Sequence, residues 1–121
     1  MIYGHESAAY IGDISLGDNL NCKIAVYGDE GDVPHFHIKN DDSSFECCVC
    51  IYEPKYYDHG DRENRQLSYS QKEELNKWMH QMNKYFKQDS NWEMIDMFWE
   101  NCENNMKYVP EHSICPNYLD L

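Results

Sequence analysis

The chain has 121 residues, 41% of them apolar, which corresponds to a single domain with enough apolar material for a core. Its 22 acidic and 10 basic residues give a formal charge of −12, which argues against direct nucleic-acid binding, because phosphate backbones attract basic surfaces. No apolar run approaches the roughly 18 residues that a membrane-spanning helix needs.

The first half predicts an antiparallel sheet of three to five short strands, over about residues 8–67. The clearest alternation of apolar and polar residues is "LNCKIAVY" at 20–27, with further strands predicted at about 10–15, 35–39 and 45–52. The segment "GDEGD" between the second and third strands supplies glycines for a turn. A last, irregular hairpin is predicted around Gly60.

The second half predicts two helices, at about 70–87 and 90–106, followed by an irregular tail over 107–121. Two capping boxes mark the helix starts, Ser70 with Glu73 and Ser90 with Glu93. The first helix then carries an apolar stripe made of Leu75, Trp78, Met79, Met82, Tyr85 and Phe86. Because the connection is short, we expect antiparallel helices on one face of the sheet, and one α+β domain over 1–121.

The motif "DVPHFHIKN", residues 32–40, carries two of the six histidines. His35 and His37 point to the same side of a strand and could supply two ligands to a zinc ion. Cys48 and Cys50 share a face of the next predicted strand, which a hairpin would place beside the histidines. The predicted metal ligands are therefore these four residues, with His5, His59 or His112 as further candidates from loops.

A simpler interpretation needs no ligand. Phe36 and Ile38 would point into the core, leaving the two histidines on a partly solvated outer face. Cys47 and Cys50 have C-x-x-C spacing, but they point to opposite faces of a strand, which argues against a shared metal or a disulfide. The first ten residues lack the pattern of a signal peptide, so we expect reduced thiols and a cytosolic location.

A catalytic hypothesis uses the same motif. His35, His37 and His59, with Arg62 or the nearby Arg65, are the residue types of a metal-free ribonuclease. In such an enzyme imidazole moves protons and guanidinium stabilises the charged transition state. No phosphate-binding glycine motif accompanies these residues.

The stretch "VYGDEGDVPHFHIKN" resembles the hallmark of a small bacterial and phage family of unknown function. Its members carry a strand, a polar turn and the sequence Pro-Pro-His-Phe-His-Val, then a strand pair and two helices with a tryptophan in each. Residues 34–38 match this motif, with Val33 in place of the first proline. Trp78 corresponds to the first helical tryptophan, and Trp92 or Trp99 to the second, so the resemblance spans about residues 20–103.

The resemblance implies no catalytic residues, although some family members are described as toxins of toxin–antitoxin pairs. Size, acidity and aromatic content favour a small cytosolic interaction module that binds another protein in a defence, counter-defence or toxin–antitoxin setting. That partner is expected to be basic or nucleic-acid-binding. The alternatives are a nuclease-like toxin that uses the two motif histidines, and a domain with a structural zinc site.

Overall fold

The computed structural model describes residues 9–27, 33–58, 65–101 and 114–121. In chain order the elements are strands β1 (Ala9–Ser15), β2 (Asn21–Val26), β3 (His35–Asn40) and β4 (Glu46–Cys50), helices α1 (Tyr69–His80) and α2 (Asn91–Glu100), and a short 3₁₀ helix, η2 (Tyr118–Asp120). A sheet in the first half and two helices in the second confirm the predicted α+β fold. The hairpin predicted around Gly60 lies outside the described residues.

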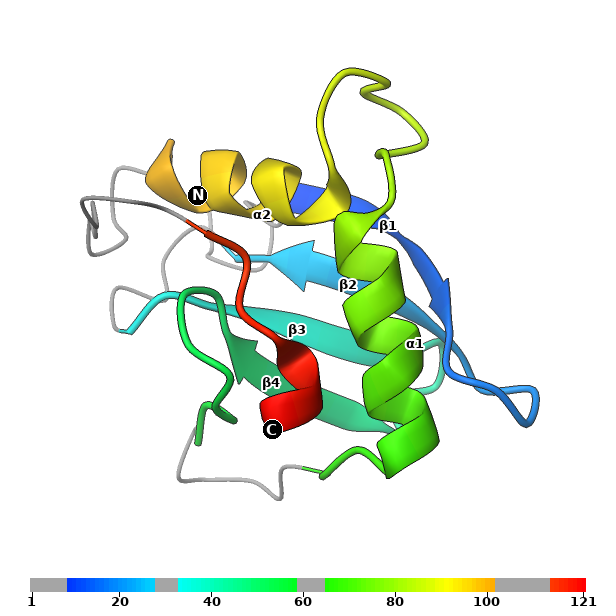
Figure 1. The fold of residues 1–121 in the computed structure, drawn as a ribbon. Coiled ribbons are helices and arrows are strands. Elements are labelled where there is room, and N and C mark those ends of the chain that lie inside the picture. The colour runs from blue at the N-terminus through cyan, green and yellow to red at the C-terminus, as the bar shows by residue number, and fades with distance from the viewer. Residues whose placement is uncertain (1–8, 28–32, 59–64, 102–113) are drawn as a thin grey trace, which may run out of the picture.

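The four strands form one antiparallel sheet in the order β1-β2-β3-β4. The helices and η2 lie over one face of this sheet, and α2 crosses near the C-terminal end of α1 (Figure 1). The other face, which we call the outer face, carries His35 and His37 of β3 together with Cys48 and Cys50 of β4, because opposite residues of paired strands share a face.

The core lies between the sheet and the helices. Ile24, Phe36, Ile38 and Val49 come from the strands, and Leu75, Met79, Trp92, Ile95 and Trp99 come from the helices. Tyr118 of η2 also enters this core, where its hydroxyl donates to the carbonyls of Cys50 and Ile51 at 3.3 and 3.1 Å. The described end of the predicted irregular tail therefore contributes to the core.

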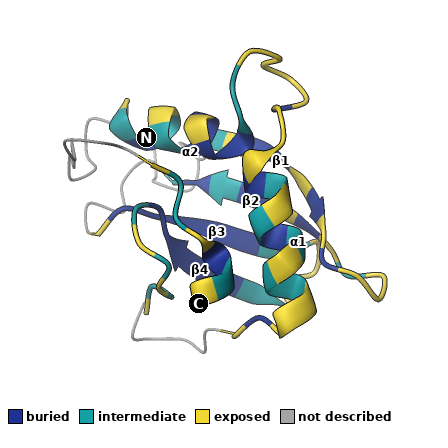
Figure 2. Ribbon diagram, in the orientation of Figure 1, coloured by how far each residue is buried: buried dark blue, intermediate teal, exposed yellow. Residues whose placement is uncertain are grey.

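The outer face of β3 and β4 is buried, which makes the expectation of partly solvated histidines wrong. Figure 2 shows both strands as buried over most of their length. The chain after β4 turns back along the sheet, where the Tyr57 amide donates to the Cys48 carbonyl at 2.9 Å. The ring of Tyr57 then stacks on His35 with 3.8 Å between ring centres.

The helix boundaries differ from the prediction in three places. The first capping box is formed by Ser68 and Gln71 rather than by Ser70 and Glu73, because Ser68 has the extended backbone of an N-cap and its hydroxyl accepts from the Gln71 amide. The second box, Ser90 with Glu93, is confirmed. Helix α1 ends at His80 instead of near residue 87, and α2 ends at Glu100 instead of near residue 106.

The early end of α1 changes the predicted core. Met82, Tyr85 and Phe86 were expected on its apolar stripe but are exposed in the connection between the helices. The side chain of Asn83 holds this connection, because its oxygen accepts from the amides of Tyr85 and Phe86, each at 2.9 Å. An asparagine side chain that bonds nearby backbone amides competes with helix continuation.

Candidate metal site on the outer face of the sheet

Three potential metal ligands meet on the outer face, one from β3 and two from β4. His37 lies directly opposite Cys48 in the antiparallel register, and Glu46 lies two residues before Cys48. Residues two apart on a strand point to the same side, so strand geometry alone places the imidazole, the thiol and the carboxylate on one surface.

The distances between these groups are those of a ligand set. The His37 Nδ1 atom is 3.2 Å from Glu46 Oε2 and 3.3 Å from Cys48 Sγ, and the three ligand atoms all lie within 4.8 Å of one another. Around a tetrahedral zinc, nitrogen and oxygen ligands are separated by about 3.3 Å, and nitrogen and sulfur ligands by about 3.6 Å. The two contacts at His37 are about 0.1 and 0.3 Å shorter than these values.

A single ring nitrogen, His37 Nδ1, makes both contacts, with Glu46 and with Cys48. The Nδ1 atom of a neutral imidazole either carries one hydrogen or offers one lone pair. If it donates to Glu46, then it has no lone pair left to accept from the Cys48 thiol. If it accepts from the Cys48 thiol, then its lone pair faces the Glu46 carboxylate. A cation at this point would be attracted by all three groups at once.

The site is enclosed. The side chains of His37 and Glu46 are 2% and 16% exposed, and Cys48 is 1% exposed. The ring of Tyr27 covers His37 edge-on, with 4.5 Å between ring centres. Interactions between charges are stronger in such a water-poor place than at an open surface.

The structure brings together two of the four predicted metal ligands, His37 and Cys48. His35 belongs to a different environment, since its Nδ1 atom is 2.7 Å from the Val33 carbonyl and its ring stacks on Tyr57, with the Trp99 ring centre 5.6 Å away. Cys50 lies opposite His35, and burial raises the pKa of its thiol, which disfavours the thiolate that binds metals. His5, His59, His112 and Arg62 lie outside the described residues.

Glu46 is the ligand that the sequence interpretation missed. The signal was present, because Glu46 and Cys48 have the same two-residue spacing as the histidines that suggested the site. Only the register of β3 against β4 distinguishes Glu46 from the other acidic residues of the chain. Cys47, predicted as a core residue, is buried on the opposite face, and burial raises the pKa of its thiol far above the usual range.

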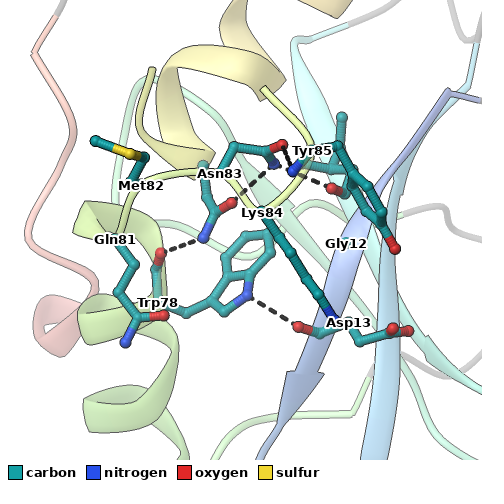
Figure 3. A pocket seen from close by; sticks show the side chains of 10 residues that line it. Gly12, Asp13, Trp78, Gln81, Met82, Asn83, Lys84 and Tyr85 are labelled. Atoms are coloured by element: carbon teal, nitrogen blue, oxygen red, sulfur yellow. Dashed lines mark hydrogen bonds between the residues drawn. The ribbon is translucent and has the colours of Figure 1, made fainter. Parts of the chain in front are cut away.

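A separate hollow of about 200 Å³ lies between β1 and the connection that follows α1 (Figure 3). The Trp78 indole donates to the Asp13 backbone carbonyl at 2.9 Å. The side-chain amide of Asn83 donates to the Ile11 backbone carbonyl at 3.1 Å. These bonds occupy carbonyl groups of the edge strand and so protect it against pairing with another chain. We interpret the residues that line this hollow as a structural junction between the sheet and α1, and not as a ligand-binding site.

No family model, curated protein or solved structure shows significant similarity to the chain. Within the described residues, neither helix has the length and apolar character required to cross a membrane.

Proposed function

We propose that the protein is a zinc-binding domain in which one ion is held by His37, Glu46 and Cys48. The observation that carries this proposal is the convergence of three different ligand atoms within 4.8 Å on two adjacent strands. Thiolate, imidazole and carboxylate are the ligands that zinc uses in proteins. His37 and Cys48 retain the roles predicted for them from the sequence, and Glu46 takes the place of His35 and Cys50.

The three residues would fill three of the four tetrahedral positions of a zinc ion, and the burial of the site favours a structural role for the ion over contact with a large substrate. Zinc would connect β3 to β4 and neutralise a carboxylate and a thiolate that are costly to bury as charges. Because ligands from two strands meet only in the folded chain, binding of the metal would add directly to the free energy of unfolding.

Cobalt substitution and thermal unfolding test this function together. We expect Co²⁺ to give thiolate-to-cobalt absorption in the wild-type protein, and chelation to lower the melting temperature. Cys48→Ala should abolish both effects, and Glu46→Gln should weaken cobalt binding. Cys47→Ala is the matched control, because its side chain is the adjacent thiol on the opposite face. A wild-type protein with no thiolate absorption and no response to chelation would refute the proposal.

A second candidate function is binding of a protein partner, which the size and acidity of the chain favour. Met82, Tyr85 and Phe86 form an apolar ridge in the connection between the helices, with 63%, 55% and 51% of their surfaces exposed. Tyr10 of β1 extends this ridge, with 6.1 Å between its ring centre and that of Tyr85. Exposed aromatic side chains are frequent anchors of protein interfaces.

A binding comparison tests this second function. Wild-type protein and a triple variant, with serine at Met82, Tyr85 and Phe86, would be used to capture basic proteins from a lysate. We expect a partner that binds the wild type and the Tyr69→Ser control but is lost with the triple variant. Tyr69 is equally exposed but lies at the N-terminal end of α1. Equal capture by all three proteins would exclude the ridge as the binding surface.

The toxin–antitoxin setting, the cytosolic location and the nuclease hypothesis stay predictions. Of the predicted catalytic residues, His35 and His37 are buried beneath Tyr57 and beside Tyr27. This environment supports ligand and packing roles for the two histidines better than contact with a polymeric substrate.

A further inference from the structure

Two lysines lie side by side on the outer face. Lys23 of β2 and Lys39 of β3 are direct cross-strand partners in the antiparallel register. Like charges in this position destabilise a sheet, since opposite side chains of paired strands approach closely. The arrangement is notable in a chain with only 10 basic residues against 22 acidic ones.

Neighbouring acidic residues compensate these lysines unequally. Lys23 has Asp13 as its other cross-strand partner, and its ammonium lies 3.6 Å from Asp41. Glu46 is the corresponding partner of Lys39, but its Oε2 atom lies 3.2 Å from His37. Among the residues that the structure describes, Lys39 forms no ion pair. Its ammonium instead lies 5.9 Å from the centre of the Tyr27 ring.

Both lysines line a hollow of about 370 Å³ on this face. The surrounding side chains are those of Tyr10, Ala25, Tyr27, His37, Asn40, Asp41 and Ser43. Asp41 is the acidic residue among these lining groups, and it is 90% exposed beside Lys23, so its ion pair is weak and easily opened. Among the described residues that line the hollow, Lys39 is therefore a basic group that no ion pair neutralises.

The rim of this hollow is held in place by the turn between β3 and β4. The Asn40 side chain accepts from the Phe45 amide at 3.0 Å and donates to the Ser44 hydroxyl at 2.8 Å. Ser43, which lines the hollow, has a φ of 60°. A rim that is already ordered reduces the entropy lost when a ligand binds.

We propose that this hollow binds a small oxyanion, the phosphate or carboxylate group of a small molecule, between Lys39 and Lys23. An oxyanion placed there would turn the unfavourable pair of ammonium groups into two charge-assisted contacts. The hydroxyl and amide groups of the rim supply further hydrogen bonds. This site is separate from the proposed zinc site, although His37 borders both.

Titration with inorganic phosphate and with acetate, followed by the amide NMR signals of Asn40 and Ser43, tests this proposal. Chloride at matched ionic strength controls for screening. We expect saturable shifts with phosphate, acetate or both, and the anion that saturates identifies the group recognised. Lys39→Gln should weaken binding by about tenfold, because a charged hydrogen-bond partner is lost. Lys77→Gln, on the exposed face of α1, should leave binding unchanged.

A variant without the proposed metal site separates the two proposals. Cys48→Ala keeps both lysines, so it should still bind the anion with unchanged affinity even though it loses zinc. Shifts that rise linearly with all three salts, or binding that is the same in Lys39→Gln and wild type, would overturn the oxyanion site. Loss of anion binding in Cys48→Ala would equally overturn it, because the anion would then be bound to the metal.

Discussion

Replacement of Asn83 should destabilise the junction between the sheet and the helices. Its side-chain amide donates to the Ile11 carbonyl at 3.1 Å and to the Asn91 side-chain oxygen at 2.9 Å. Its side-chain oxygen accepts from two backbone amides of the connection between the helices. One buried side chain therefore joins β1, this connection and α2.

The expected cost of Asn83→Ala follows from the fate of these partners. The two amides of the connection are only partly buried, so water can replace the side-chain oxygen at small cost. The Ile11 and Asn91 oxygens are buried, and each loses a donor at a cost of about 1–2 kcal/mol. We expect the free energy of unfolding to fall by about 3 kcal/mol, a large part of the stability of a domain of this size.

Urea unfolding followed by tryptophan fluorescence measures this change. Asn83→Asp adds a second comparison, because the carboxylate keeps the accepting oxygen but cannot donate to Ile11 or Asn91. It should destabilise the protein at neutral pH at least as much as alanine does. Asn21→Ala, at an exposed strand position, is the matched control. A loss below about 1 kcal/mol for Asn83→Ala would refute the view that this residue organises the junction.

Three further predictions concern the core and the sheet. Gly12→Ala should lower stability by about 1 kcal/mol in urea unfolding, because the added Cβ would lie 3.3 Å from the Trp78 ring; equal or greater stability would show that the ring moves freely. Tyr118→Phe should cost about 1 kcal/mol in thermal unfolding, through loss of the hydroxyl bonds to two backbone carbonyls, and an unchanged melting temperature would contradict this. Burial raises the pKa of the Cys22 thiol from 9.0 to about 11, so the folded state holds its proton more tightly and stability should fall as the pH rises from about 9. The Cys22→Ala protein should lose less stability than the wild type between about pH 9 and pH 11. Identical pH profiles of the two proteins would contradict a contribution of the Cys22 thiol to this pH dependence.

Much of the fold could be predicted from local patterns. The two-residue alternation at 20–27 corresponds to β2, and the apolar spacing after residue 70 corresponds to the first part of α1. The end of α1 could not be predicted from this spacing, because Met82, Tyr85 and Phe86 continue the helical pattern beyond its last residue. Asn83 accepts from the nearby Tyr85 and Phe86 amides and also donates to Ile11 of β1 and Asn91 of α2. These last two bonds depend on long-range packing that the spacing does not reveal.

The candidate site could be predicted only in part, for a related reason. Alternation along β3 separates the faces of the strand but does not indicate whether the outer face is covered. His35 and His37 therefore resembled residues of a half-solvated strand, whereas Tyr57 stacks on His35, Tyr27 lies edge-on against His37, and both histidines are buried. The choice of Glu46 over Cys50 as a ligand depends on cross-strand register and side-chain direction, neither of which is visible in residue spacing alone.

The central claim, a zinc ion held by His37, Glu46 and Cys48, is tested most directly by zinc stoichiometry. Untagged wild-type, Cys48→Ala and Cys47→Ala proteins would be equilibrated with zinc against a competing chelator, and their metal content measured by elemental mass spectrometry. We expect about one zinc per chain in the wild type and in Cys47→Ala, and none in Cys48→Ala. Absence of zinc from the wild type, or full retention by Cys48→Ala, would contradict the assignment of this site.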